Sequence, residues 1–287
     1  MKPPSFGYQL AQDLPDAFAH YAAATDDVLW LAGGHSIVPS LALRLQAPGL
    51  LIDISRLPEL AGITVSDDGL RIGATTRHAE LLSNPLVAEH APMLAQAAHF
   101  VAHPAIRNHA TFGGNLALAD PASEFPAVVR CLGGMFDIVG PDGERTVAAE
   151  DFFLDLYTTA IEPGEILRSI LIPPAPPGTL TAFDELARRH GDYAMVGAAV
   201  RLVMDDGLIG QAGLCFHSVG ATPIRAENAE AALVGHPLDD ATITAARDAL
   251  AQDLDPADEP TMPGATRLHL AEVLLGRILS RLATPAP

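Results

Sequence analysis

The sequence of 287 residues has only two cysteines and a single lysine. Cys131 and Cys215 lie far apart and form neither a CxxC pair nor a Cys/His cluster with zinc spacing. Because an iron–sulfur cluster usually takes four thiolates, the chain cannot hold one alone. With Lys2 as its only lysine and a net charge of −18, the chain is a poor candidate for sequence-independent nucleic-acid binding. Solubility is the simpler role of this acidity.

Long apolar runs and targeting signals are also missing. No stretch approaches the roughly 18 uninterrupted apolar residues of a membrane span, and residues 1–10 have neither a basic run nor an apolar segment. We therefore expect a cytoplasmic protein without stable membrane insertion. Hydrophobic residues make up 49% and charged residues 18%, which indicates a globular chain.

Metal ligation is not favoured by the spacing of the candidate ligands. His103 and His109 flank a short loop, but no carboxylate or third histidine stands at ligand spacing. Both cysteines are expected to be small buried hydrophobes.

The first stretch, up to about residue 56, has the pattern of a βαβ unit. The predicted elements are a helix at 15–24 opened by Asp13 or Leu14, a strand at 28–33, a helix at 37–45 and a strand at 50–55.

The second stretch, about 57–175, combines hairpins and helices. Turn sequences at 66–69 and 141–143 each join two strand-like runs. The further elements expected are a helix near Arg77 capped by Thr76, a helical segment at 86–101, a glycine-containing loop at 111–115, a helix from Asp120-Pro121 to about Leu132, and a strand at 165–172.

A proline-rich segment at 173–178 cannot be helical and separates a third stretch of different texture. Strands come first there and helices follow, which predicts a separate α+β domain. Strands are expected within 181–189, 194–204 and 208–220, and helices near 226–234, 240–252 and 264–282.

Two double-glycine segments are the candidate binding motifs. Ala32-Gly33-Gly34-His35-Ser36 lies between a predicted strand and helix, where glycines let the backbone approach a ligand and free N–H groups suit a phosphate. Alone, such a turn is more often only a tight connection. Thr111-Phe112-Gly113-Gly114-Asn115 repeats the pattern. Together the two segments favour a diphosphate held by backbone N–H groups.

Three blocks carry a specific resemblance: residues 31–45, 103–128 and 187–202. They resemble the FAD-binding medium subunit of the molybdenum hydroxylases, of the carbon monoxide dehydrogenase type. The same module forms the central domain of xanthine dehydrogenases. The similarity covers essentially the whole chain, and the block at 111–124 is its most specific part.

The resemblance implies an α+β fold. It consists of a two-part FAD-binding domain of the vanillyl-alcohol-oxidase (PCMH) type followed by a small α+β C-terminal domain. The expected boundaries are 1–175 for the first domain, with subdomains of about 1–56 and 57–175, and 179–287 for the second.

Site residues follow from the same motifs. The two glycine segments would wrap the diphosphate and ribityl chain, Leu167 would lie near the adenine, and Tyr193 beside the isoalloxazine ring. Ser123 and Glu124 match a polar pair, although relatives often carry Asp in place of Glu124, and Phe112 replaces a commoner aliphatic residue. The full set of expected cofactor-binding residues is Ala32, Gly33, Gly34, His35, Ser36, Ile37, Thr111, Gly113, Gly114, Asn115, Ser123, Glu124, Leu167 and Tyr193.

The roles of several other polar residues allow two interpretations. Arg188, Arg189, His190 and Asp192 could tune the flavin or face a partner, or simply form a solvated strand end. Asp53 could resemble the acidic ribose ligand of a Rossmann domain, but the G-x-G-x-x-G that should accompany it is missing.

The family implies an electron relay. FAD in this chain would take electrons from [2Fe-2S] clusters in a small subunit, which receive them from molybdopterin cytosine dinucleotide in a large subunit, and pass them to quinone, oxygen, NAD or another acceptor. Assembly as a dimer of heterotrimers is implied as well. The substrate could be carbon monoxide, a purine alkaloid, a nicotine-like heterocycle, an aldehyde or an acyl-CoA compound. The alternatives are a self-sufficient FAD-dependent oxidoreductase and a scaffold subunit without cofactor.

Overall fold

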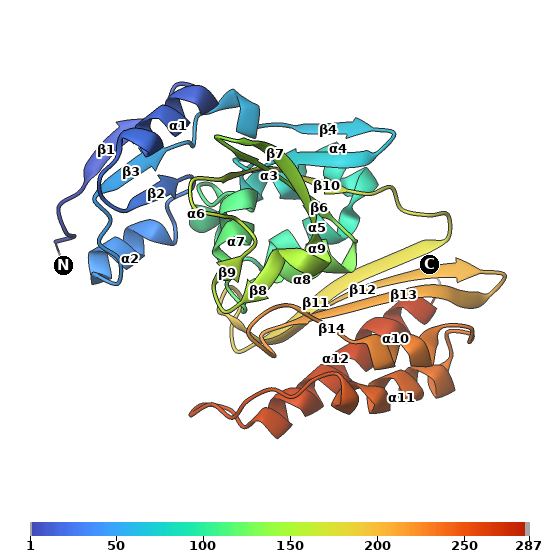
Figure 1. Cartoon of the computed structure of the whole chain (residues 1–287). Coiled ribbons are helices and arrows are strands. Elements are labelled where there is room, and N and C mark those ends of the chain that lie inside the picture. Colours follow the sequence, from blue (N-terminus) through green and yellow to red (C-terminus); the bar gives the residue numbers. More distant parts are fainter. Residues whose placement is uncertain (1, 285–287) are drawn as a thin grey trace.

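A computed structural model describes residues 2–284 of the chain. Three of the four sheets in residues 2–284 form consecutive layers with the helices between them, with the N-terminal elements at one end and the last three helices at the other (Figure 1). The mixture of helices and strands agrees with the predicted α+β fold.

The first layer is a parallel three-stranded sheet in the order β1-β3-β2. β2 and β3 pair in parallel, so the predicted βαβ unit is confirmed, while the edge strand β1 was not predicted. Asp13 caps the first helix by accepting a hydrogen bond from the Asp16 N–H. The elements are β1 (Gly7–Leu10), α1 (Leu14–Ala23), β2 (Val28–Leu31), α2 (Ile37–Leu43) and β3 (Leu50–Asp53).

The second layer is an antiparallel five-stranded sheet in the order β4-β5-β10-β6-β7. Both predicted hairpins are present, with β4 paired to β5 and β6 paired to β7. The strands are β4 (Ile63–Ser66), β5 (Gly69–Gly73), β6 (Met135–Gly140), β7 (Gly143–Ala148) and β10 (Ile166–Ile172).

Helices cover this sheet, and the structure corrects one predicted cap and one predicted helical segment. Thr76 caps nothing: it is buried, and the helix α3 (His78–Ser83) instead follows Arg77, whose N–H donates to Glu80. The segment 86–101 is two helices, α4 (Pro85–His90) and α5 (Pro92–Phe100), because Pro92 cannot continue the first. The other elements here are η1 (Pro58–Leu60), α6 (Pro104–Arg107), α7 (Phe112–Leu118), α8 (Glu124–Cys131), α9 (Ala149–Phe152), β8 (Phe153–Asp155) and β9 (Thr158–Thr159).

The third layer is an antiparallel sheet in the order β11-β12-β13-β14, with three helices along one face (Figure 1). The predicted strands and helices of this part of the chain are all present. The elements are β11 (Thr179–Ala187), β12 (Ala194–Asp205), β13 (Leu208–His217), β14 (Ile224–Arg225), α10 (Glu227–Leu233), α11 (Asp240–Ala249), η2 (Leu250–Gln252) and α12 (Gly264–Ala283).

The third sheet is buried on both faces. One face packs against α10, α11 and α12. On the opposite face, Phe183, Ala199 and Cys215 belong to the same core as the helices α5 and α8. Cys131 lies in this contact, and both cysteines are free and buried, as predicted. The third sheet is therefore joined to the rest of the chain through a continuous apolar core.

Among the described residues, no helix combines the length and the apolar character required to cross a membrane.

Candidate functional site

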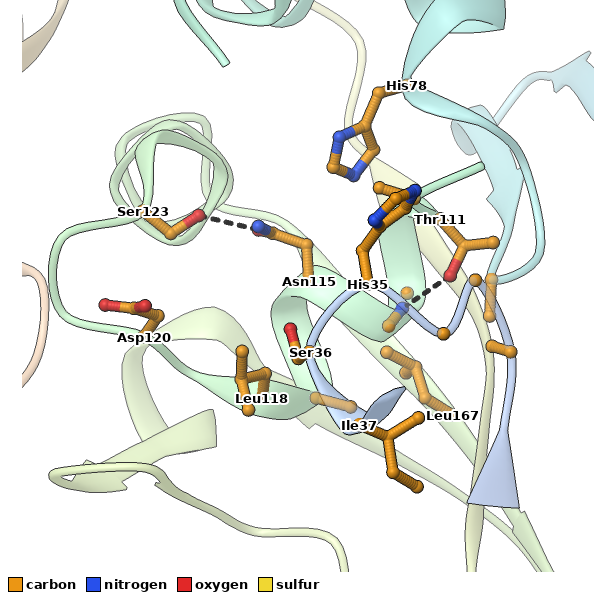
Figure 2. Close-up of a pocket in the computed structure, with 18 of the residues that line it drawn as sticks. His35, Ser36, Ile37, His78, Thr111, Asn115, Leu118, Asp120, Ser123 and Leu167 are labelled. Atoms are coloured by element: carbon orange, nitrogen blue, oxygen red, sulfur yellow. Dashed lines mark hydrogen bonds between the residues drawn. The ribbon is translucent and has the colours of Figure 1, made fainter. Parts of the chain in front are cut away.

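A cleft of about 700 Å³ lies where the first layer meets the second and the edge of the third. Its volume falls within the usual range for small-molecule sites, about 300–1,000 Å³. All the residues that sequence reasoning expected to bind a cofactor line this one cleft. Figure 2 shows part of this lining, with side chains from the loop after β2, from α7 and from the turn that follows α7.

The loop between β2 and α2 brings free backbone donors to the cleft. Within residues 2–284, the N–H groups of Gly33, Gly34, His35 and Ser36 donate no hydrogen bond. Gly34 has φ +78, a conformation that glycine adopts without strain, and its carbonyl accepts from the Val38 N–H. Consecutive unpaired N–H groups of this kind form an anion-binding concavity.

Gly33 is required for a different reason, namely the close approach of two loops. A Cβ atom at Gly33 would lie 2.5 Å from the His109 carbonyl oxygen and 2.9 Å from both the Ala110 Cα and the Thr111 nitrogen. These are backbone atoms, so no side-chain rotation could make room. The first glycine loop is therefore held directly against the backbone that leads into the second.

The second glycine segment is helical, so the predicted loop at 111–115 is wrong. Gly113 and Gly114 lie in the first turn of α7. The backbone N–H groups here already have partners: that of Phe112 donates to Thr76, that of Gly113 to Ala74, that of Gly114 to Thr111 and that of Asn115 to Thr111. The prediction that main-chain amides of both segments are free for a ligand thus holds only for the first.

Gly113 has a packing role instead. A Cβ atom there would lie 2.4 Å from the Ala74 Cβ and 2.7 Å from its Cα. The glycine lets α7 rest on the chain that follows β5, which brings the start of α7 to the cleft wall.

Thr111 fixes the start of α7 because its Oγ1 accepts a 3.2 Å hydrogen bond from the Gly114 N–H (Figure 2). We expect Thr111→Val to lower the free energy of unfolding by about 1 kcal/mol, the usual cost of losing such a cap. Thr111→Ser keeps the hydroxyl and should leave stability nearly unchanged. Equilibrium denaturation of the two variants measures this, and equal stabilities would contradict the capping role.

A tight turn, rather than the predicted helix start, follows α7. The Asp120 carboxylate accepts from the Ala122 N–H at 2.9 Å, and the helix α8 begins only after Ser123. Pro121 therefore belongs to the turn. The Ser123 hydroxyl donates to Asn115 Oδ1 at 2.8 Å, so the second segment and the turn are joined across the cleft wall (Figure 2).

Two acidic groups and a tyrosine meet at one end of the cleft. The Tyr193 hydroxyl, from the loop between β11 and β12, donates to Asp120 Oδ2 at 3.1 Å. Tyr193 is 74% exposed, yet its partial burial, followed by the Asp120 charge, raises its pKa to about 12. Burial, and then the Asp120 charge, raises the pKa of Glu124 to about 7. Glu124 thus lines the cleft, with its carboxyl partly protonated near neutral pH.

Histidines gather near the junction of the two glycine segments. The His35 and His109 rings have centroids 5.7 Å apart, and burial followed by the His109 and Arg77 charges lowers the pKa of His35. His78 lines the cleft but is 2% exposed, and burial lowers its pKa to about 4. His35 and His78 are therefore largely uncharged at neutral pH, and both line the cleft.

The central strand of the second sheet supplies the opposite wall. Leu167 lines the cleft beside a register shift between Leu167 and Ser169, an irregularity that often occurs next to binding sites. Glu165 also lines it, and the Arg145 guanidinium lowers the pKa of this carboxyl through hydrogen bonds of 2.7 and 2.6 Å.

Several lining residues were missed because nothing in their local sequence marks them. They come from segments spread between residues 29 and 165 and become neighbours only through tertiary packing. Among them are Leu29, Trp30, Thr75, His78, Ile106, Leu118, Thr159, Ile161 and Glu165.

The residues left open by the sequence divide between cleft and surface. Asp192 lines the cleft, whereas Arg188 and Arg189 follow the end of β11 as exposed side chains. Asp53 lies outside the cleft and accepts a hydrogen bond from Tyr8 at 2.7 Å. Phe112 is also outside it: its ring is fully buried edge-on against Phe125, with centroids 5.2 Å apart. Having Phe112 where an aliphatic residue is commoner therefore changes the core behind the glycines and not the lining of the cleft.

Two family profiles match the chain in consecutive segments. Residues 4–175 match the FAD binding domain in molybdopterin dehydrogenase, and residues 181–282 match the CO dehydrogenase flavoprotein C-terminal domain.

Curated relatives match over almost their whole length. The 6-hydroxypseudooxynicotine dehydrogenase complex subunit alpha of Paenarthrobacter nicotinovorans is 39% identical over 98% of this chain and 95% of its own. The carbon monoxide dehydrogenase medium chain of Afipia carboxidovorans is 38% identical over 98% of both chains. The caffeine dehydrogenase subunit beta of a Pseudomonas species is 36% identical over 99% of this chain and 96% of its own.

Solved structures share the fold throughout. A chain of carbon monoxide dehydrogenase from Hydrogenophaga pseudoflava superimposes with a TM-score of 0.94 at 36% identity, covering 98% of both chains. A chain of quinoline 2-oxidoreductase from Pseudomonas putida 86 gives a TM-score of 0.93 at 35% identity, covering 99% of this chain and 98% of that one.

Proposed function

The chain belongs to the family of FAD-binding medium subunits of molybdenum hydroxylases, and on that premise we propose that it relays electrons for a reaction carried out in another subunit. As an oxidoreductase subunit, it would receive electrons from an iron–sulfur subunit and pass them through FAD to an external acceptor. The large subunit would hold molybdopterin cytosine dinucleotide and the small one [2Fe-2S] clusters. We further propose a dimer of heterotrimers in the cytoplasm.

The cleft residues fit FAD. The cofactor's diphosphate needs hydrogen-bond donors, and the free N–H groups of residues 33–36 supply them in a cleft whose lining, within residues 2–284, has neither lysine nor arginine. This observation carries the proposal. When bound, FAD would supply the exchange between two-electron and one-electron transfer, while the protein supplies binding and electrostatics.

Residue roles are proposed from the same geometry. Residues 32–37 would hold the diphosphate, and Thr111, Gly113, Gly114 and Asn115 would form the rigid wall beside the ribityl chain. The Asn115–Ser123 pair would present polar atoms next to it. Leu167 would pack near the adenine. Tyr193, held by Asp120 and joined there by Glu124, would lie beside the isoalloxazine ring.

We place the domain boundary in the proline-rich segment, with an FAD-binding domain at 1–175, divided near residue 56, and a C-terminal domain at 179–287. The cores of α1 with β3 and of α10–α12 with the third sheet support separate units. The core shared by α5, α8 and the third sheet would fix their relative position.

The two alternative functions have less support. A scaffold without cofactor would have no need of unpaired N–H groups or of a glycine pressed between two loops. A self-sufficient oxidase would need its own substrate site, yet the cleft-lining residues outside the expected cofactor set are mostly apolar or already paired. Since relatives are named for substrates as different as carbon monoxide and caffeine, we propose that the large subunit sets the substrate.

The test uses the purified chain alone. We expect it to bind FAD and turn yellow, with about one FAD per chain, and to hydroxylate none of the candidate substrates. Adding the two partner subunits should restore substrate-dependent reduction of the bound FAD. A colourless protein in excess FAD would overturn the assignment of the cleft, and substrate turnover by the isolated chain would overturn the relay.

A further inference from the structure

A glutamate, a glycine and a histidine form a row across the third sheet. Glu185 on β11 pairs with Gly197 on β12, which pairs with His217 on β13. Because side chains alternate between faces, this row shares the face of Phe183, Ala199 and Cys215, which pack against α5 and α8. Two titratable groups are thus buried between the C-terminal sheet and the part of the chain that forms the cleft.

Gly197 allows the two side chains to meet. A Cβ atom there would lie 1.8 Å from His217 Nε2, so only glycine lets the ring extend over β12. His217 Nε2 lies 3.8 Å from Glu185 Oε2, and the two side chains are 1% and 3% exposed. The Phe183 ring stacks on the His217 ring, with centroids 5.8 Å apart.

Within the described residues, neither His217 Nε2 nor Glu185 Oε2 has a hydrogen-bond partner. Buried polar atoms nearly always have a hydrogen-bond partner. Each of these two atoms is the nearest candidate partner of the other, and a hydrogen bond between them would need one proton. At 3.8 Å the two atoms are not yet hydrogen-bonded, and on closer approach either the Glu185 carboxyl would donate to Nε2 or Nε2–H would donate to the carboxylate. His217 Nδ1, 3.2 Å from the Ser218 hydroxyl, can accept or donate there, so both tautomers are possible.

Burial favours the uncharged form of both groups. It raises the pKa of Glu185 to about 8, with the charges of Glu124 and Asp184 acting in the same direction. It lowers the pKa of His217 to about 4, opposed by the Ala122 carbonyl. Near neutral pH, a carboxylic acid therefore faces a neutral imidazole, and the carboxyl can lose its proton just above that pH.

The pair is coupled to the cleft through the start of α8. Glu124 lines the cleft and acts electrostatically on Glu185. The Ser218 N–H donates to the Pro121 carbonyl at 2.8 Å, so the turn that carries Asp120 is fixed directly to the end of β13. The pair thus lies behind the cleft wall, next to the acidic end.

The other charged groups around the pair are few. Asp184 points to the opposite face of β11, where it pairs with Arg281. Arg201, on the same face as the pair, lies further along β12. Helix α5 contributes the uncharged Gln96, whose side chain accepts from the Phe183 N–H. Glu124 is therefore the charged group through which the cleft can act on Glu185.

We propose that Glu185 and His217 form a proton-binding site that responds to the charge in the cleft and thereby adjusts the reduction potential of the cofactor bound there. This rests on the proposed function. When bound FAD is reduced, it would take two electrons from an external donor and protons from solvent. Any negative charge that remained in the cleft would raise the affinity of Glu185 Oε2 for a further proton taken from solvent. By linkage, a protonated pair favours the reduced cofactor to the same extent.

The first experiment needs no cofactor. Infrared difference spectra between about pH 6 and about pH 9 should show carboxylic-acid carbonyl absorption from both Glu124 and Glu185 at the lower pH, because both carboxyls titrate in this range. The Glu185 component should be missing in Glu185→Gln and displaced in His217→Gln. Asp184→Asn, which changes a neighbouring carboxylate on the other face of the strand, should retain it. An identical band in wild type and Glu185→Gln would overturn the proton site.

The second experiment measures the midpoint potential of the bound FAD from about pH 6 to about pH 9 in the same variants. The wild-type potential should fall more steeply with pH than that of Glu185→Gln around and above pH 8. The difference should be at most about 30 mV per pH unit, the slope of one extra proton per two electrons. His217→Gln should move the pH range in which its slope differs from that of Glu185→Gln. Asp184→Asn should show the same pH dependence as wild type. Equal slopes in wild type and Glu185→Gln would overturn the linkage.

The two readouts separate the possible failures. If the chain binds no FAD, the proposed function and the linkage both fail, whereas the infrared band still decides whether the proton site exists. If FAD binds and the slopes are equal, the linkage alone fails.

Discussion

Replacing Gly33 with alanine is expected to remove most of the affinity for FAD. The added Cβ would lie 2.5 Å from the His109 carbonyl oxygen and within 2.9 Å of two further backbone atoms, so the two loops must separate. Forcing an extra methyl group into packed structure costs about 1–3 kcal/mol, which corresponds to about 5- to 140-fold in affinity at 1.4 kcal/mol for each factor of ten. A flavin fluorescence titration measures the dissociation constant.

The matched control is Gly210→Ala on β13. A Cβ there would make ordinary contacts, 3.4 Å from the Asp205 Cβ and 3.5 Å from the Val203 carbonyl oxygen, far from the cleft. It should bind FAD like wild type. Gly113→Ala, whose Cβ would lie 2.4 Å from that of Ala74, should weaken binding as Gly33→Ala does. Wild-type affinity in both cleft variants would contradict the account of why these glycines are needed.

The glycine pair at 33–34 shows what a local pattern reveals and what it hides. Its position between a strand and a helix correctly predicted a connection that leaves backbone N–H groups unpaired. The reason for Gly33 could not be predicted, because it lies in the backbone of His109–Thr111, more than seventy positions away in sequence. The sequence pattern therefore identified Gly33 correctly, but only part of the reason why glycine is needed there could be predicted.

Helix starts were predicted less well than strands. Asp120-Pro121 has the composition of a helix start, but the Asp120 side chain is used to close a turn, and the helix begins at Glu124. Thr76 also has a suitable side chain, yet the fold buries it. In both cases several arrangements satisfy the same local signal, and tertiary packing selects one. Strands separated by short turns, as at 66–69, leave far less choice.

Contacts across the third sheet lay beyond sequence reasoning. Glu185, Gly197 and His217 are ordinary residues in apolar strands, and they meet only because the register of β11, β12 and β13 places them in one row. A shift of one residue in either pairing would move the members to opposite faces. His78 was missed for the same reason, since its place in the cleft wall depends on its contact with Phe125 of α8 and on the hydrogen bond of its N–H to the Ala110 carbonyl.

Glu185→Gln is expected to stabilise the protein increasingly as pH rises. The pKa of Glu185 is raised to about 8 in the folded chain, against 4.5 for an unperturbed glutamate. The unfolded chain thus releases this proton at lower pH than the folded one. The contribution of Glu185 to the free energy of unfolding is therefore fully present below about pH 4.5 and declines until about pH 8. At about 1.4 kcal/mol per pKa unit, the loss is on the order of 3–5 kcal/mol for this buried group.

The contribution of His217 to stability should depend on pH in the opposite direction. Its pKa is lowered to about 4 from 6.5, so its contribution is complete above about pH 6.5 and is lost as pH falls towards 4. Glutamine has no titrating proton at either position. The stability gained by Glu185→Gln should therefore grow from about pH 5 to about pH 8, and that gained by His217→Gln should grow from about pH 7 down to about pH 4. Chemical denaturation across this range measures both, with Asp184→Asn as the control for removing a carboxylate from β11. A difference from wild type that stays constant with pH would show that the two groups are not buried in their neutral forms, and the paired proton site would have to be abandoned.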